Sequence, residues 1–458
     1  MLRERIGHPL VALFFAFALT APWVFVEVTR GGIEMSGGPE THYLGYSVTV
    51  LVSGIAVLGA SFLLAWAAET AEKDVPRAFA IAVLAVLAVA PEYAVDALYA
   101  WTAGANVGTG AGAEAANLAV ANMTGANRIL IGLGWSGIAL FTVYRAKRTR
   151  DPAVELREGF LADRVHIDRS LALEIVFLLA ATGYAMLVPL GGGITVLDTV
   201  FLVGLYVLYI AVVLRGDVED EEEHVGVPAY LQQFARPVRA SASIFLFAFS
   251  GAMIYLAVHP FAHGLEAIGK SAGVPPFFMI QWIAPLASES PELIVVAYLV
   301  NKARSTAGFN ALISSKLNQW TLLIGTLAVV YSVAAGQVGT LPFDHRQAAE
   351  IWITAAQSYF AIAVLTNFTI SLREAVAILG LFASQVAVEY AIIRMVASGA
   401  RAEELSVFVL DGFTVVYLLI GTALFVYRRK ETAAIFRTTA TTVSDAFRRS
   451  PPPAGDAD

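Results

Sequence analysis

Two stretches of the sequence decide the fold: residues 90–97, which read APEYAVDA, and residues 290–297, which read SPELIVVA. Each stretch places a proline and a glutamate in the middle of a long apolar segment. An ionisable side chain at the centre of a membrane span costs about 2.5–3.5 kcal/mol on insertion scales, so it marks a candidate site. The proline removes a backbone donor and frees a carbonyl one turn earlier. The two stretches therefore predict two membrane helices, each interrupted by Pro91 or Pro291.

The composition of the whole chain agrees with a membrane protein. Of its 458 residues, 57% are hydrophobic, 15% are charged and none is cysteine. Soluble domains have about a quarter of charged residues, so the composition excludes a soluble enzyme, a disordered protein and a disulfide-stapled secreted domain. The formal net charge of −7 does not indicate nucleic-acid binding. The lipid bilayer is the expected partner.

Apolar stretches of about 20 residues are long enough to cross the hydrocarbon core, and about twelve of them follow one another along the chain. Their continuous apolarity favours helices over an outer-membrane barrel. The expected fold is an all-α polytopic membrane protein. The predicted spans lie near residues 9–28, 43–68, 76–103, 114–144, 170–190, 193–214, 240–259, 276–301, 307–335, 350–369, 373–396 and 404–427.

The basic residues give an independent test of this count, because arginine and lysine concentrate in cytoplasmic loops. If the N-terminus is inside and every span changes the side, about 23 of the 30 basic residues fall inside and about four fall outside. An error of one span in the middle of the chain would destroy this bias. We therefore expect a multi-pass protein of the cell membrane with both termini in the cytoplasm.

This topology makes the two proline-glutamate helices run in opposite directions. Each is followed by a second polar helix, and aligning these second helices pairs Asn117 with Asn310 and Asn122 with Ser315. Inverted repeats with helices broken at the midplane are the architecture of secondary transporters. We expect a five-plus-five inverted core with an extra helix at each end. The predicted regions are an extra helix (1–42), a first half (43–214), an acidic cytosolic linker (215–239), a second half (240–396), a C-terminal helix (397–430) and a cytosolic tail (431–458).

Packing the inverted pairs face to face would bring Glu92 and Glu292 together at the midplane. Two carboxylates with freed carbonyls and Asn or Ser oxygens form a hard-oxygen site suited to Ca²⁺ or Na⁺. Without a cation the two carboxylates cannot easily both be ionised, so protons should compete with the cation. Asp96 and Glu289 lie about one turn from these glutamates and are expected to line the same pathway.

Two basic residues fall inside predicted spans. Arg128 follows Asn127 in the first copy, and Lys316 follows Ser315 in the second. They are either members of structural ion pairs or part of ion coupling, and Arg128 should pair with a carboxylate because it stays charged when buried. Glu389 stands alone in a late span, whereas Glu350 lies near a span end, where a water-facing carboxylate is ordinary.

The repeated pattern resembles the α-repeats of the cation/calcium antiporter superfamily, of which sodium/calcium exchangers are the best-known members. The usual first motif, Gly-Thr-Ser-x-Pro-Glu, stands here as LAVAPE at residues 87–92 and ASESPE at residues 287–292. The usual second motif, Gly-Asn-x-x-Gly-Ser-Asn, is similar to ANMTGAN at residues 121–127, and SSKLNQW at residues 314–320 departs further.

The resemblance implies a secondary cation antiporter that uses no cofactor other than its transported Ca²⁺, Na⁺ or H⁺. It implies that Glu92 and Glu292 coordinate the cation and that oxygens of Asn122, Ser288 and Ser315 complete the site. Because the hydroxyls of the first motif are missing at residues 88 and 89, calcium/proton or sodium/proton exchange stands beside sodium/calcium exchange.

Two other classes of function remain open at this stage. A membrane enzyme would need a metal pair such as His259 and His263, which flank Pro260 but have no HExxH motif beside them. A degenerate transporter kept as a sensor would explain the charges of Arg128 and Lys316.

Overall fold

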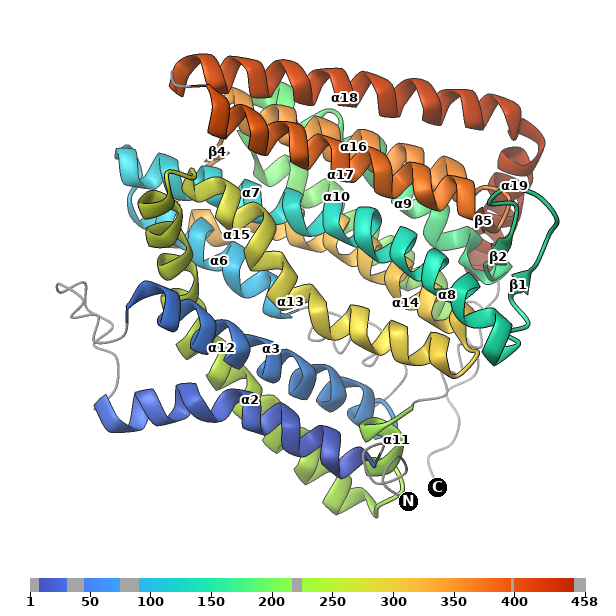
Figure 1. Cartoon of the computed structure of the whole chain (residues 1–458), viewed down its shortest axis with the longest axis horizontal. Coiled ribbons are helices and arrows are strands. Elements are labelled where there is room, and N and C mark those ends of the chain that lie inside the picture. The colour runs from blue at the N-terminus through green and yellow to red at the C-terminus, as the bar shows by residue number, and fades with distance from the viewer. Residues whose placement is uncertain (1–7, 31–44, 75–89, 216–224, 397–398, 449–458) are drawn as a thin grey trace.

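The computed structural model describes residues 8–30, 45–74, 90–215, 225–396 and 399–448, and most of these residues are helical (Figure 1). The helices are α2 (Pro9–Arg30), α3 (Tyr46–Ala71), α6 (Ala90–Ala105), α7 (Gly110–Ile129), α8 (Ser136–Thr149), α9 (Ala172–Ala185), α10 (Val196–Arg215), α11 (Val227–Leu231), α12 (Arg236–Ala272), α13 (Pro276–Asn301), α14 (Ser305–Asn318), α15 (Ile324–Ala335), α16 (His345–Leu365), α17 (Leu372–Met395), α18 (Gly399–Tyr427) and α19 (Arg429–Arg448). Shorter helical turns are η2 (Leu130–Trp135), η3 (Arg169–Leu171), η4 (Val188–Gly191) and η5 (Gln319–Leu323). The strands are β1 (Val154–Glu155), β2 (Arg164–His166), β3 (Gly193–Ile194), β4 (Leu341–Pro342) and β5 (Thr369–Ser371).

Within the described ranges, ten helical runs are long and apolar enough to cross a membrane, and the bent helix α13 adds an eleventh. Each falls on a predicted span. The remaining predicted span, residues 76–103, is described only from Ala90 onward, as α6. The all-α polytopic membrane fold is therefore confirmed. The acidic run at residues 217–223 and the tail from residue 450 lie outside the described residues.

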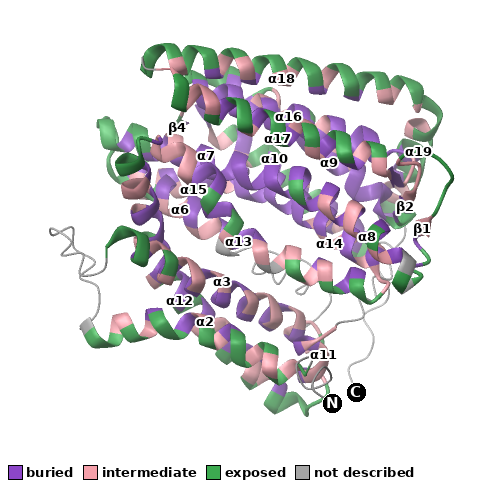
Figure 2. Cartoon of the chain, viewed as in Figure 1, coloured by how far each residue is buried: buried purple, intermediate pink, exposed green. Residues whose placement is uncertain are grey.

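The outer helices turn apolar side chains away from the protein. Phe14 of α2, Leu197 of α10 and Phe408 of α18 are 67%, 72% and 75% exposed, and Figure 2 shows long exposed stretches on α2 and α18. By contrast, 89% of the residues in the most apolar segment of α16 are buried. We conclude that α16 is a central helix and that the outer helices face lipid.

The two helix pairs identified in the sequence pack across one another. α6 packs against α7 and also against α15, while α13 packs against α14 and also against α7. A glycine permits one close approach, since a Cβ at Gly125 of α7 would lie 1.9 Å from the backbone oxygen of Gln281 in α13. α6, α7, α13 and the α14–α15 run therefore surround a common centre. α2, α3 and α12 form a separate layer beside it (Figure 1).

Two small antiparallel sheets join connections that lie far apart in the sequence. β2 pairs with β1 and with β5, and β3 pairs with β4. The topology from basic residues puts both connections of the first sheet inside and both connections of the second sheet outside. An odd number of spans between paired strands would place them on opposite sides of the membrane. The pairing therefore supports an even number of spans between residues 166 and 369, as predicted.

Residues 429–448 form the helix α19, in the region that the sequence predicts only as a cytosolic tail. α19 packs against α9 and α10, and the Thr439 hydroxyl donates to the Ala172 oxygen at 3.1 Å. Just before α19, Arg428 forms an ion pair with Glu374 and donates to the Val364 oxygen at 2.6 Å. These contacts connect Arg428 and α19 to α9, α16 and α17.

The end of α3 is fastened to the start of α12 by an ion pair. Arg239 donates from Nε to Asp74 Oδ2 at 2.7 Å, and its Nη2 contacts the other carboxylate oxygen. Lys73 Nζ donates to the Gln232 oxygen at 3.1 Å beside this pair. The hydrogen bond from Arg239 holds the pKa of Asp74 below its ordinary value of 3.8. α3 and α12 are thus tied together at the ends that we predict to be cytoplasmic.

The substitution Asp74→Asn is expected to lower the thermal unfolding midpoint at neutral pH by a few degrees. A lowered carboxyl pKa contributes stability above the unfolded pKa, and that stability disappears as the pH falls through the folded pKa. The difference between wild type and variant should therefore be complete at neutral pH and vanish well below the ordinary pKa of 3.8. Thermal unfolding in detergent over a pH series measures it, with Glu404→Gln on exposed α18 surface as the control. A constant difference across the series would contradict the assignment.

Candidate functional site

Four carboxyl groups gather where α6 and α13 approach each other. Glu92 and Asp96 lie one turn apart on α6, and Glu289 and Glu292 lie on α13. Glu92 is 4% exposed, Asp96 and Glu289 are 0% exposed, and Glu292 is half-buried. Glu92 interacts electrostatically with the other three carboxyl groups. The acidic residues of both repeats therefore share one centre.

The backbone is bent at this centre. The two parts of α13, Pro276–Ser290 and Glu292–Asn301, meet at an angle of 48°. Pro291 lies at the bend, and prolines commonly kink helices because they remove a backbone hydrogen bond. Pro91 lies in the first described turn of α6.

The second helix of each repeat supplies hydrogen bonds to these carboxyl groups. Asn122 of α7 donates from Nδ2 to Asp96 Oδ1 at 2.9 Å. Ser315 of α14 donates its hydroxyl to Glu292 Oε2 at 3.0 Å. The two residues that the repeat alignment pairs thus each donate to a carboxyl group of their own repeat, Asn122 to Asp96 and Ser315 to Glu292. Gln319, which the sequence analysis did not single out, donates to Glu289 Oε1 at 2.6 Å, and its place one turn after Ser315 was the available signal.

Several oxygens of the centre are buried without a hydrogen-bond partner in the protein. They are Glu92 Oε2, Asp96 Oδ2, Glu289 Oε2, Asn122 Oδ1 and Gln319 Oε1. Leaving such oxygens unpaired is costly, and carboxylate and amide oxygens are the ligands that Ca²⁺ prefers. Nowhere in the described ranges do three Asp, Glu, His or Cys side chains form a group that could hold a metal ion. Amide and hydroxyl oxygens are therefore required to complete any cation site here.

Three other predicted residues occupy different positions. Ser288 lies one turn before Glu292 and donates to the Pro285 oxygen at 3.3 Å. Asn310 of α14 is half-buried, and its Oδ1 has no hydrogen-bond partner. Asn117 is half-buried, and it donates to Asp344 Oδ2 at 2.7 Å rather than to a carboxyl group of the centre. Asn117 thus helps to hold the start of α16.

Arg128 is fully buried and forms an ion pair with Glu350 of α16, as expected for a buried guanidinium. Its Cζ lies 4.6 Å from the ring centroid of Trp282 in α13. The prediction that Glu350 faces water is wrong, because its side chain is 0% exposed. The predicted span begins at residue 350, whereas α16 begins at His345. This earlier start carries Glu350 into the interior of the protein.

A second buried ion pair joins α16 to α17. Arg346, which the topology assigns to an outer loop, is 7% exposed and pairs with Glu389. Glu389 also interacts electrostatically with Glu350 and Arg128. The lone glutamate of the late span therefore has an identified partner.

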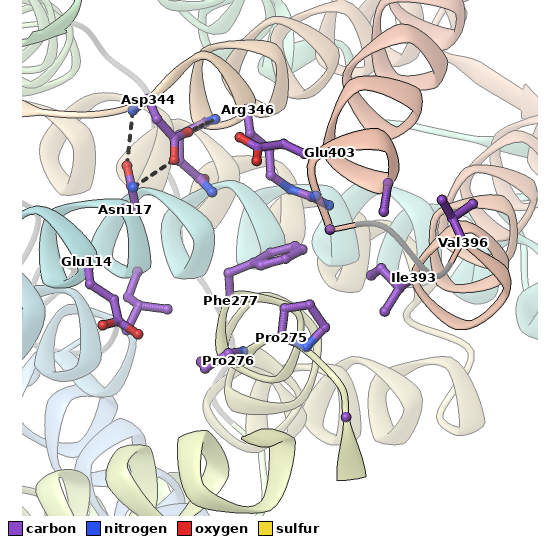
Figure 3. A pocket seen from close by; sticks show the side chains of 15 residues that line it. Glu114, Asn117, Pro275, Pro276, Phe277, Asp344, Arg346, Ile393, Val396 and Glu403 are labelled. Carbon is purple, nitrogen blue, oxygen red and sulfur yellow. Dashed lines mark hydrogen bonds between the residues drawn. The ribbon is translucent and has the colours of Figure 1, made fainter. Parts of the chain in front are cut away.

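A cavity of about 460 Å³ opens beside this pair, on the side predicted to be outside (Figure 3). Its lining includes Glu114, Asn117, Phe277, Asp344, Arg346 and Glu403, which are labelled in Figure 3.

Lys316 contacts Asn127, the residue that precedes Arg128. Its Nζ donates to Asn127 Oδ1 at 2.7 Å and to the Asn127 backbone oxygen at 3.3 Å. The ammonium also lies 4.3 Å from the ring centroid of Trp320. Lys316 is 0% exposed. A π-helical turn follows each of these regions, η2 after α7 and η5 after α14, and such turns are frequent at functional sites.

The histidine pair considered for a metal enzyme lies elsewhere, on α12. The helix continues through Pro260, so the expected loss of helical register does not occur. The rings of His259 and His263 stack with centroids 6.3 Å apart. Across the parts of the chain that the structure describes, no metal-binding group includes them. The zinc-enzyme hypothesis gains no support from this geometry.

Comparison with known proteins points to one family. The sequence model of a family described as sodium/calcium exchanger protein matches residues 45–215 and 242–391. The crystal structure of the H⁺/Ca²⁺ exchanger CAX is 40% identical, with 95% of this chain and 98% of that chain covered and a TM-score of 0.80. The structure of native YfkE is 13% identical, with 81% of this chain and 98% of that chain covered and a TM-score of 0.55, a likeness of fold alone. No curated protein sequence matches this chain.

Proposed function

The chain belongs to the sodium/calcium exchanger protein family, and we propose that it is a secondary-active antiporter that moves Ca²⁺, or Na⁺, against a gradient of H⁺ or Na⁺. Membership makes it a multi-pass membrane protein and a cation exchanger. One observation carries the finer proposal: Glu92 and Glu292, contributed by inverted helix pairs, share a buried centre with oxygens that have no protein partner.

In this proposal Glu92 and Glu292 bind the transported cation directly. Asn122 and Ser315 already contact carboxyl groups of the centre, and their oxygens would complete the coordination together with Ser288. Ca²⁺ takes about six to eight oxygen ligands, more than two glutamates supply. Asp96, Glu289 and Gln319 are the further oxygen donors nearby.

Exchange follows from the charge of this centre. Four carboxyl groups in one buried place repel one another when ionised, and either a cation or protons relieve that repulsion. A divalent cation and protons therefore compete for the same groups. The 40% identity with an H⁺/Ca²⁺ exchanger supports H⁺ as the coupling ion, with Na⁺ as the alternative.

Inverted repeats operate by alternating access, in which one group of helices moves against another around a fixed site. We assign residues 43–214 and 240–396 to the two halves, flanked by the helix of residues 1–42 and that of residues 397–430. The connection at residues 215–239 and the tail at residues 431–458 would lie in the cytoplasm, as would both termini. The expected location is the cell membrane.

Flux into proteoliposomes tests the proposal directly. Proteoliposomes that contain the purified full-length protein are expected to accumulate Ca²⁺ when a proton gradient is imposed. The proton gradient should also collapse faster when Ca²⁺ is present. Separate arms replace the proton gradient by a Na⁺ or a K⁺ gradient. Ca²⁺ uptake with Na⁺ alone would identify a sodium/calcium exchanger.

The absence of flux under every gradient would overturn the proposal. The buried charges of Arg128 and Lys316 are the observation that would then favour a non-transporting sensor. Calorimetry of the same folded sample separates the two cases, since a sensor binds Ca²⁺ or Na⁺ without moving it.

A further inference from the structure

Lys316 has the surroundings of a bound cation. Its Nζ is 2.7 Å from Asn127 Oδ1 and 3.3 Å from the Asn127 backbone oxygen. The face of Trp320 lies 4.3 Å away, at ring-centroid distance. An amide oxygen and a backbone carbonyl of one residue are also what a sodium ion would use as ligands. An ammonium group thus occupies oxygens that could serve a metal ion.

Lys316 lies close enough to the acidic centre to interact with one of its carboxyl groups. Lys316 is attracted by Glu289, whose Oε1 accepts from Gln319 while its Oε2 is buried without a partner. Arg128, the other buried cation of this region, is paired with Glu350 instead. Of these two buried basic side chains, Lys316 is therefore the one that interacts with a carboxyl group of the site.

The fold does not require a cation at this position. The repeat alignment that pairs Asn122 with Ser315 places Met123 opposite Lys316. Met123 is fully buried, so an apolar side chain fills the corresponding position of α7. A lysine costs more than a methionine in such a place unless its charge is used.

We infer that Lys316 is a tethered monovalent cation, which occupies one cation position of the transport site and fills the place of a soluble Na⁺ or similar ion. This inference rests on the proposed function. A covalently attached cation cannot dissociate during the cycle. The chain should therefore transport Ca²⁺ without any need for a soluble monovalent metal ion at this position, and the remaining centre around Glu92 and Glu292 should carry the substrate.

The test uses variants that differ in the space they leave. Lys316→Ala and Lys316→Ser leave a cavity beside Asn127 and Glu289, Lys316→Met fills it as Met123 does in the first repeat, and Lys316→Arg keeps a tethered charge. Purified full-length proteins are compared by equilibrium binding of radioactive Na⁺. The alanine and serine variants should bind one Na⁺ per chain more than wild type does. The methionine and arginine variants should show no such gain.

Two further readouts use the same proteins. In choline chloride, Ca²⁺ uptake by the alanine variant should fall about tenfold or more, because the acidic centre loses its counter-charge, and NaCl should restore it. Uptake by wild type should be the same in both salts. NaCl should also raise the thermal unfolding midpoint of the alanine and serine variants above that in choline, with no such difference for wild type.

Equal Na⁺ binding by wild type and by the folded alanine and serine variants would overturn the inference. Restoration of the methionine variant by NaCl would overturn it as well, because that variant leaves no room for the ion. Variants that fold only in NaCl would support it. Failure of the proposed function is a separate result: wild type would then carry no Ca²⁺, while Na⁺ binding and Na⁺-dependent unfolding still decide the role of Lys316.

Discussion

Glu92→Gln and Glu292→Gln are each expected to reduce proton-driven Ca²⁺ uptake by about 100-fold or more, which brings it to the level of empty vesicles. Glutamine keeps the shape of the side chain and one oxygen but removes the negative charge. Interactions of polar groups with a charged partner contribute about 1.5–3 kcal/mol each, and every 1.4 kcal/mol is tenfold in affinity. The loss should appear in both variants, since Glu92 and Glu292 interact electrostatically and are both ligands in the proposed site. Initial rates in proteoliposomes measure it.

The matched control is Glu158→Gln, which makes the same chemical change at an exposed position between β1 and β2. It should transport at the wild-type rate. Each variant must also elute as a single species, so that lost flux is not lost folding. Normal uptake by either Glu92→Gln or Glu292→Gln in folded protein would refute the assignment of the two glutamates as cation ligands.

The features that the sequence predicted well are those encoded locally. A span is recognised by its own apolar residues, and the fold class follows from the series of spans. The side of the membrane on which each connection lies stays a prediction from the arginines and lysines. The convergence of Glu92 with Glu292 was predictable for a further reason, because a repeat with matched motifs places equivalent residues around one axis.

What could not be predicted depends on contacts between distant residues. Arg128 and Glu350 are separated by 222 positions, and Arg346 and Glu389 by 43. Nothing near Glu350 in the sequence marks it as buried, since its exposure depends on where α16 begins and on how many helices surround α16. The bond between Asn117 and Asp344, 227 positions apart, is a further contact of this kind, and the role of Asn117 in the ion pathway stays a prediction.

The short strands and the position of α19 could not be predicted from the sequence either. The strands of the two small sheets have two or three residues each, too few for a period to be recognised. Their pairing is stabilised by the helices that bring the connections together. α19 is strongly amphipathic, so its helical period is readable in the sequence, but its position against α9 and α10 is not.

The buried pair of Arg128 and Glu350 carries the other large expected effect, this time on stability. Arg128→Met and Glu350→Gln should each lower the free energy of unfolding by about 3–5 kcal/mol, because removing one partner leaves an uncompensated buried group. Trp282 cannot take over the role of Glu350, since a cation–π contact is worth only about 0.5–2 kcal/mol. Unfolding in detergent, followed by temperature or denaturant, measures the loss.

The double variant Arg128→Met/Glu350→Gln decides whether the two residues act as a pair. It removes both charges, so its loss of stability should be clearly smaller than the sum of the two single losses, by about 2 kcal/mol or more. Glu155→Gln is the control, because Glu155 pairs with Arg157 where both side chains are about 40% exposed, and exposed pairs add little stability. Additive losses would mean that Arg128 and Glu350 are stabilised by other groups. A large coupling would instead show that this ion pair is a structural contact between α7 and α16.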